Sequence, residues 1–93
     1  MTEIVYDEAK RVRVLAERSL DMARAGEVFG GFHLTRSDDK HSDREERFHS
    51  VGLLAGEVVI VTWTPRDGVR RIVTMWKANE RERTRYHEQR ERS

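Results

Sequence analysis

Cysteine is absent from the 93 residues, and proline occurs only once. The absence of cysteine excludes disulfide frameworks, thiolate nucleophiles and cysteine-ligated zinc or iron-sulfur sites, and it fits the reducing cytoplasm. Hydrophobic residues make up 37% of the chain against 38% charged residues, so the apolar side chains must be concentrated in a few elements. No apolar run approaches the roughly 18 residues of a membrane-spanning helix, and no signal-peptide pattern opens the chain. We therefore expect one soluble domain over residues 1–93.

Positive charge is distributed unevenly, although the formal net charge is only +1. Residues 1–65 contain 9 Lys and Arg against 12 Asp and Glu, whereas residues 66–93 contain 9 against 5. Such asymmetry indicates a basic surface suited to a polyanion, although a solvated charged helix would account for part of it.

The first third of the chain has the pattern of a short strand followed by helices. Residues 3–6 suit a strand. Asp7 can cap a helix whose apolar residues recur at helical spacing, and Asp21 can cap a second helix. The glycine pair Gly30-Gly31 ends that second helix. These helices are expected to form one layer of the fold.

From residue 32 onward the apolar period changes to two, which predicts strands. Four runs show this period: residues 32–35, 47–54, 57–64 and 69–76. The turn sequence Pro65-Arg66-Asp67-Gly68 predicts that the last two runs form an antiparallel hairpin. Residues 79–90 return to an almost wholly polar helix, in which Asn79 and Glu82 can form a capping box. The expected fold is α+β, in the order β-α-α-β-β-β-β-α.

Alternation along the last strand assigns its side chains to two faces. One face receives Arg70, Ile72, Thr74 and Trp76, and the other receives Arg71, Val73, Met75 and Lys77. Val73 and Met75 are then expected in the core. The open face would carry Arg70, Thr74 and Trp76, where the indole could stack on a base. A plain packing role explains Trp76 equally well.

Residues 38–47 are dense in carboxylates and basic groups. Carboxylates and imidazole are suitable ligands for divalent cations, but the spacing matches no metal motif. A solvated loop between two strands is the simplest interpretation, and catalytic use of His41 or Glu46 is the alternative. Three further histidines lack a visible partner and are interpreted as structural or surface residues: His33, His49 and His87.

Basic groups also gather on the last strand and on the helix that follows it. They are Arg70, Arg71, Lys77, Arg81, Arg83 and Arg85, with Glu82 and Tyr86 among them. Several guanidinium groups near a strand end can clamp phosphates, which favours an RNA ligand. Glu82 is equally well explained as a helix cap, and Tyr86 as an anchor that holds the helix on the sheet.

A series of short patterns, in order along nearly the whole chain, resembles the BrnT toxins, the ribonuclease halves of a bacterial type II toxin-antitoxin pair. The patterns are Tyr6-Asp7-x-x-Lys10, Ala25-x-x-Val28-Phe29, Asp38-Asp39-x-His41-Ser42, Glu45-Glu46-Arg47, Gly52, the run Val58 to Thr64, Arg71-Ile72-Val73-Thr74, Lys77-Ala78 and Glu82-x-x-x-Tyr86. The likeness rests on their order and spacing together.

The resemblance implies a RelE-like fold, in which N-terminal helices back one face of a small antiparallel sheet, a C-terminal helix follows, and an open face holds the RNA site. It implies a metal-independent, cofactor-free endoribonuclease that arrests growth from the cytoplasm. It also implies a BrnA-like antitoxin with a ribbon-helix-helix part, which sequesters the toxin and brings it to operator DNA. The residues expected to act in catalysis are Lys77, Glu82, Arg83, Tyr86 and His41. Those expected to bind RNA are Arg70, Arg71, Thr74, Trp76 and Arg81.

Two departures from the family pattern bear on activity. The family usually has Asn-Leu-x-Lys-His-Gly where this chain has residues 14–19, so no role of that Lys-His pair carries over. It usually has Ile-Ser-x-Arg-Lys-Ala where this chain has residues 73–78, which places Trp76 at the arginine position. The alternative function is therefore a weakened or silent toxin homologue that binds antitoxin or RNA and tunes repression of the operon.

Overall fold

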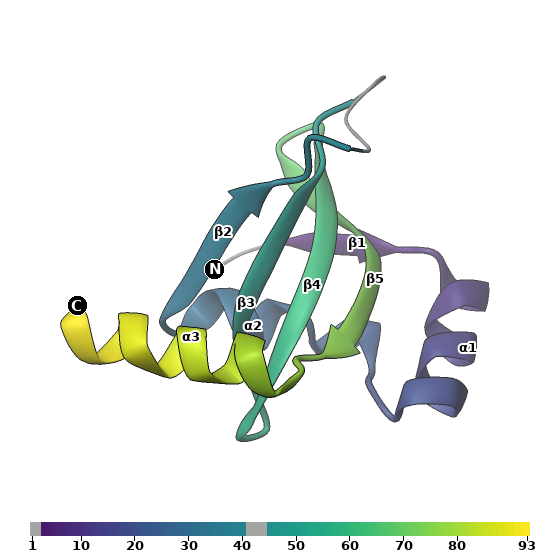
Figure 1. Cartoon of the computed structure of the whole chain (residues 1–93). Helices are drawn as coiled ribbons and strands as arrows, with labels where there is room; N and C mark the ends of the chain where they lie inside the picture. Colours follow the sequence, from purple (N-terminus) through teal and green to yellow (C-terminus); the bar gives the residue numbers. More distant parts are fainter. Residues whose placement is uncertain (1–2, 41–44) are drawn as a thin grey trace.

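The structure, a computed structural model, describes residues 3–40 and 45–93. Its elements in chain order are β1 (Ile4–Tyr6), α1 (Glu8–Arg18), the 3₁₀ turn η1 (Met22–Arg24), α2 (Gly26–Gly30), β2 (His33–Ser37), β3 (Phe48–Leu54), β4 (Glu57–Arg66), β5 (Val69–Lys77) and α3 (Glu80–Arg92) (Figure 1). The fold is α+β, as predicted. Within the described residues, no helix is long and apolar enough to cross a membrane.

The N-terminal helices begin where the capping residues predict. The Asp7 side chain accepts a hydrogen bond from the backbone N–H of Lys10, and α1 ends at Ser19 in the left-handed conformation. Asp21 caps the next segment by accepting from Ala23. That segment differs from the single helix expected there, because it divides into the turn η1 and the short helix α2.

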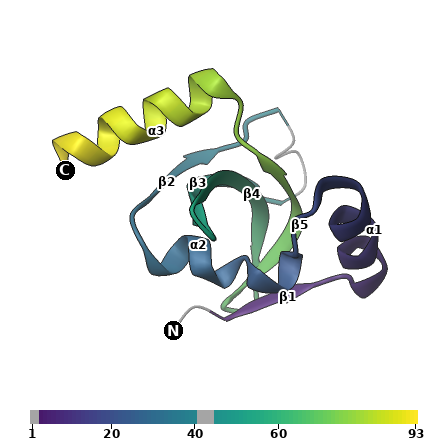
Figure 2. The ribbon, with the colours of Figure 1, turned by 90° about the horizontal axis from the view of Figure 1, so that it is seen from below.

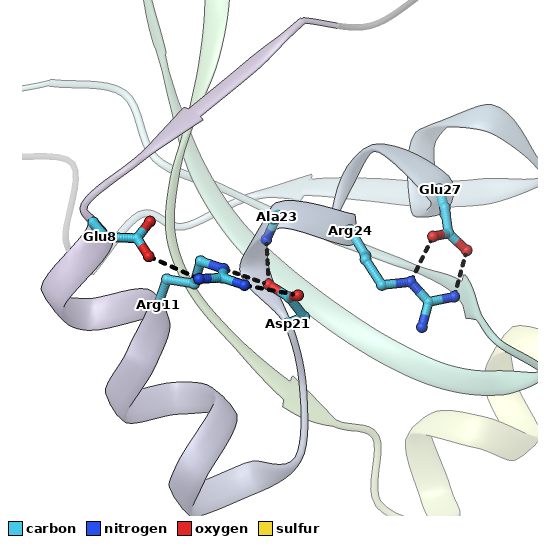
Figure 3. A network of polar contacts seen from close by, with 6 residues as sticks. All are labelled: Glu8, Arg11, Asp21, Ala23, Arg24 and Glu27. Atoms are coloured by element: carbon cyan, nitrogen blue, oxygen red, sulfur yellow. Dashed lines mark hydrogen bonds and ion pairs between the residues drawn. The ribbon is translucent and has the colours of Figure 1, made fainter.

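A polar network joins α1 to η1 (Figure 3). Arg11 donates from Nε to Asp21 Oδ1 at 2.8 Å and from Nη1 to Glu8 Oε1 at 2.7 Å. The hydrogen bond from Arg11, followed by that from the Ala23 N–H, lowers the pKa of Asp21 below its usual range. The carboxylate therefore stays charged down to acidic pH and keeps holding the start of η1 beside α1.

The five strands form one mixed sheet in the order β1-β5-β4-β3-β2. The four pairings differ in direction: β2 to β3, β3 to β4 and β4 to β5 are antiparallel, whereas β1 pairs with β5 in parallel. The expectation of an antiparallel sheet is therefore wrong for β1. A parallel neighbour needs a long crossover connection, and the first strand and the last are separated here by most of the chain.

The predicted hairpin between β4 and β5 is confirmed. Asp67 and Gly68 both adopt positive φ, at 52° and 82°, which is the backbone of a type I′ turn. Ala55 and Gly56 repeat this geometry between β3 and β4, at 51° and 83°. Both turns match the twist of their strands and fix the register of the three central strands.

A bulge in β5 changes the faces that simple alternation assigned. Thr74 pairs with Thr62, but the next residue of β4, Trp63, pairs with Ile72, so Val73 is an extra residue in the ladder. As a result Ile72 and Met75 lie in the same core cluster, at 2% and 0% exposure. The expectation that Ile72 faces away from Met75 is therefore wrong, as is the placement of Val73 beside Met75 in the core.

Each face of the sheet has its own core. On one side, which we call the inner face, Val59, Val61, Ile72 and Met75 pack against Val14, Leu20, Met22, Ala25, Val28 and Phe29 from the N-terminal helical segments. The other side is the outer face, where α3 contributes its one buried side chain, Tyr86, to a cluster with Val58, Ile60 and Ala78. Figure 2 shows α2 and α3 on opposite sides of the sheet.

Helix α3 lies across the end of the sheet at which β5 finishes (Figure 1). Its capping box is confirmed, because Asn79 Oδ1 accepts from the Glu82 N–H and Glu82 Oε1 accepts from the Asn79 N–H, both at 2.8 Å. The Tyr86 hydroxyl donates to the Phe32 carbonyl at 2.9 Å. Helix α3 covers only one end of the outer face, and polar side chains occupy the other end.

Candidate nucleic-acid interface

Beyond α3 the outer face carries two rows of polar residues across the strands. In one row His49, Thr62 and Thr74 lie side by side on β3, β4 and β5. In the next row Thr64 pairs with Arg71. The register of β3 and β4 extends this second row to the residue just before β3, which is Arg47. The face therefore changes from apolar beneath α3 to polar and basic at its other end.

His49 links the outer face to the end of β2. Its Nδ1 lies 2.8 Å from Thr62 Oγ1, and its Nε2 lies 2.9 Å from Asp38 Oδ2. Its ring also meets Trp76 edge-on, with the centroids 5.7 Å apart. The premise that His49 lacks a partner is wrong, because strand pairing brings Asp38 to it. Both ring nitrogens are engaged, which agrees with a structural role.

Arg18, at the end of α1, contacts the part of β5 that is not paired with β1. It donates to the Met75 carbonyl at 2.7 Å and to Thr74 Oγ1 at 3.0 Å. The hydroxyl of Thr74, which the sequence places on the open face for RNA, is thus already an acceptor for Arg18. This contact brings a guanidinium group to the edge of the outer face.

Three of the predicted RNA-binding residues share the outer face: Arg71, Thr74 and Trp76. The expectation that Arg71 faces away from Thr74 and Trp76 is wrong, because the bulge at Val73 reverses the alternation. Arg71 forms no ion pair with any residue in the described ranges. Trp76 is half-buried and packs against the cluster around Ile60, so the packing role is present whether or not a base also stacks there. A cation and an indole beside a row of hydroxyl groups suit a phosphate chain with bases.

Arg70 lies on the opposite face from Trp76, which corrects the expectation that they share one. Its guanidinium carbon lies 4.1 Å from the Phe29 ring centroid and 4.7 Å from that of Trp63, both on the inner face. Burial lowers the pKa of Arg70. The cause is the bulge at Val73, which reverses the alternation between residue 72 and residue 74. Arg70 therefore closes the inner core rather than facing RNA.

Two adjoining hollows run along β2 and share Arg36. One, of about 410 Å³, is lined by Arg36, Ser37, Asp38, Asp39, Lys40 and His49. The other, of about 370 Å³, is lined by Leu34, Thr35, Arg36, Val51, Glu82, Arg85 and Gln89. Together they form a path along β2 from the end of the sheet to α3, with Arg36, Lys40 and Arg85 supplying positive charge.

The predicted residues of α3 and of the strand end are spread over several places. Glu82 lines the second hollow, whereas Arg81 lines a third hollow on the helix with Glu80 and Thr84. Arg83 donates to the Ala78 carbonyl at 2.8 Å. Lys77 lies 3.5 Å from Glu57 at the far end of β5.

Two predicted residues remain: one anchors α3 at the apolar end of the outer face, and the other is not among the described residues. Tyr86 is 1% exposed and anchors α3, and His41 falls outside the described residues. Among the residues that are described, no group of three or more His, Asp or Glu side chains could hold a metal ion.

Sequence reasoning missed three basic residues at the polar end of the outer face: Lys10, Arg18 and Arg47. Burial lowers the pKa of Lys10, and the positive charges of Arg13, Arg18 and Arg47 lower it further, while Asp7 opposes them. These charges come from α1 and from the start of β3, so only the folded chain brings them together. Lys10 and Arg47 do stand in the patterns that carry the family resemblance, which was the available signal.

Comparison with known proteins identifies a family for most of the chain. A family model described as "Ribonuclease toxin, BrnT, of type II toxin-antitoxin system" matches residues 6–82, which include every strand after β1 and all of the helical segments before them. No curated protein matches the chain. The match spans well over half of the sequence, and it confirms the resemblance drawn from the short patterns. This chain belongs to the BrnT family of ribonuclease toxins of type II toxin-antitoxin systems.

Proposed function

We propose that this chain is an endoribonuclease that cleaves RNA on the outer face of its sheet and arrests bacterial growth from the cytoplasm. The observation that carries the proposal is the polar end of that face, where Arg71, without an ion pair among the described residues, lies beside Thr64 and next to the row that contains the hydroxyl groups of Thr62 and Thr74. Polyanion binding by such a face depends on cations that no carboxylate has already neutralised. Family membership supports RNA as that polyanion.

The reaction proposed is an attack of the RNA 2′-oxygen on the adjacent phosphorus. The O2′–P bond forms while the P–O5′ bond breaks, the 2′-hydroxyl gives up its proton, and the departing 5′-oxygen gains one. In this proposal Arg71 stabilises negative charge on the phosphate oxygens, so that positioning and electrostatics carry most of the rate. Side-chain cations supply this charge in the proposal, which makes cleavage independent of added metal.

Glu82 is the proposed proton acceptor for a reacting phosphate that lies along β2, because its side chain lines the hollow that also contains Arg36 and Arg85, at the α3 end of the outer face and away from Arg71. In that arrangement we expect Glu82→Gln to lower the cleavage rate by about 10²-fold, the typical contribution of a positioned base. Glutamine can keep the capping contact with the Asn79 N–H, so the helix should remain intact. Circular dichroism checks the fold and a fluorescent RNA substrate checks the rate. An unchanged rate would remove Glu82 from the mechanism.

The neutralising partner proposed is a BrnA-like antitoxin with a ribbon-helix-helix part, through which the pair binds operator DNA. Its support is membership of a type II toxin-antitoxin family, since such toxins are paired with a protein antitoxin. We expect an acidic segment of the antitoxin to bind along β2 and at the basic end of the outer face, where it would compete with RNA.

A silent binding module is the second candidate function, and Trp76 is the observation that favours it. The residue occupies the position where the family pattern has arginine, and it packs its ring against His49 and the cluster around Ile60. The outer face of this chain then has one cation fewer than the family pattern. Such a chain would bind antitoxin or RNA without cutting RNA.

Expression of this chain and of Trp76→Arg in a bacterial host separates the two functions. We expect the original chain to arrest growth with loss of total RNA, and Trp76→Arg to act more strongly because it adds a cation to the face. The purified proteins should cleave RNA equally well with and without EDTA. Arrest and RNA decay only in the variant would identify a silenced toxin, and no effect from either would favour the binding module.

A further inference from the structure

A single row crosses three strands at the polar end of the outer face. Thr64 on β4 pairs directly with Arg71 on β5. On the other side, Phe48 pairs with Trp63, so Arg47 comes to lie beside Thr64 one step further along. Residues in one row across neighbouring strands have their side chains within reach of each other on the same face. Thr64 therefore lies between two arginine residues in the sheet.

Two polar atoms of this row are buried without a hydrogen-bond partner among the described residues: Thr64 Oγ1 and Arg47 Nε. Thr64 is 0% exposed, so bulk water does not satisfy its hydroxyl. Leaving buried donors and acceptors unpaired costs free energy, and native proteins keep few of them. Two such atoms on neighbouring residues of one row indicate a place that a polar ligand completes once the side chains that cover Thr64 move aside.

The positive charges around this row of residues indicate an anionic ligand. Lys10 reaches this region from α1: the positive charge of Arg47 is among those that lower the pKa of Lys10, after burial, Arg13 and Arg18. Asp38, whose backbone N–H donates to the Arg47 carbonyl, has its own carboxylate turned to His49. Cations held close together in this way repel one another, and an anion between them removes the repulsion.

We propose that Arg47, Thr64 and Arg71 form a binding site for one phosphate group, with Lys10 adding charge, and that the phosphate is a phosphodiester of RNA. Guanidinium groups match the oxygens of a phosphate in pairs, and the threonine hydroxyl donates to an oxygen between them. The RNA source rests on the ribonuclease function proposed above, whereas the phosphate site itself rests only on the row.

Titration of the isotope-labelled chain with inorganic phosphate, followed by NMR, tests the site directly. We expect the amide signals of Thr64 and Arg71 and the side-chain Nε signal of Arg47 to shift together. Thr64→Val removes the hydroxyl while keeping the shape, and should weaken phosphate binding by about tenfold. Arg47→Gln is a second variant that does not alter the buried threonine, and we expect the same direction.

Matched controls are available on the same molecule. Thr84→Val removes a threonine hydroxyl from the exposed hollow along α3, and Arg66→Gln changes a half-exposed arginine that pairs with Glu45. Both should bind phosphate like the original chain. Equal affinity of Thr64→Val, Arg47→Gln and the original chain would overturn the site, as would shifts confined to α3.

A dinucleotide with a 2′-deoxy linkage, which cannot be cleaved, tests the source of the phosphate. We expect it to shift the same signals and to compete with inorganic phosphate. Binding of inorganic phosphate without competition by the dinucleotide would overturn the RNA assignment and indicate a free anion as the ligand. If the dinucleotide binds at the row but RNA is never cleaved, the phosphate site stands and the proposed ribonuclease function fails.

Discussion

Replacing Arg71 with glutamine is expected to lower the rate of RNA cleavage by about 10²- to 10³-fold, the loss typical of removing one preorganised charge donor from a reacting oxyanion. Arg71 is a cation of the outer face for which no ion pair is found within residues 3–40 and 45–93, and it lies beside Thr64. Glutamine keeps the length and some hydrogen bonding but removes the charge. Single-turnover cleavage of a short RNA by the purified chain measures the effect.

Two other arginine variants serve as controls for Arg71→Gln. Arg66→Gln changes an arginine at the end of β4, close in sequence to Arg71, and should leave the cleavage rate unchanged. Arg70→Gln also should not act through RNA, because Arg70 covers Phe29 on the inner face; it should instead lower the thermal midpoint. If Arg71→Gln cleaves RNA at the original rate while remaining folded, the outer face is not the site of the reaction.

Local chemistry accounts for the parts of the fold that the sequence predicted well. Asp7 and Asp21 start their segments because a carboxylate satisfies backbone N–H groups that a helix leaves free. Asn79 and Glu82 do the same for α3 in both directions. The Asp67-Gly68 turn adopts positive φ at both residues, which few other pairs tolerate. Each of these signals depends on residues within four positions of one another.

The sequence predictions fail where contacts between distant segments determine the structure. Val73 is apolar and fits the alternating pattern, yet the pairing of β4 with β5 makes it the extra residue of a bulge. That one shift moved Arg70 to the inner face and thus out of the predicted RNA site. Nothing in residues 69–77 alone distinguishes a bulged strand from a regular one. The parallel pairing of β1 is likewise set by the whole chain between β1 and β5.

In the candidate site, too, the sequence identified residues of one strand but not contacts between different elements. Arg71, Thr74 and Trp76 were predicted as RNA-binding residues because they lie on one basic strand, although the bulge had to bring Arg71 to the same face as the other two. His49, Arg18 and Arg47 were missed because their neighbours come from other elements: Asp38 lies 11 residues from His49, and Thr74 lies 56 residues from Arg18. A buried threonine such as Thr64 gives no sequence signal at all, since its meaning depends on what flanks it in the sheet.

Tyr86 carries the prediction with the largest expected effect on stability. Its side chain is 1% exposed, it is the only buried residue of α3, and its ring lies 5.7 Å from that of Phe32. Tyr86→Ala is expected to lower the free energy of unfolding by about 3–5 kcal/mol, as for other buried aromatic residues. Much of α3 should then detach, because its other described side chains are exposed or only half-buried. Urea denaturation and the helical circular dichroism signal measure both effects.

Tyr86→Phe separates anchoring from chemistry, since it removes only the hydroxyl. That hydroxyl donates to the Phe32 carbonyl, so its loss should cost about 1 kcal/mol of stability. The buried position of the hydroxyl predicts that the cleavage rate of Tyr86→Phe stays within about twofold of the original chain, since a proton-transfer group must lie within hydrogen-bond reach of the RNA. A cleavage rate reduced by about 10²-fold with unchanged stability would instead restore Tyr86 to the catalytic residues. It would also require α3 to move away from Phe32 when RNA binds.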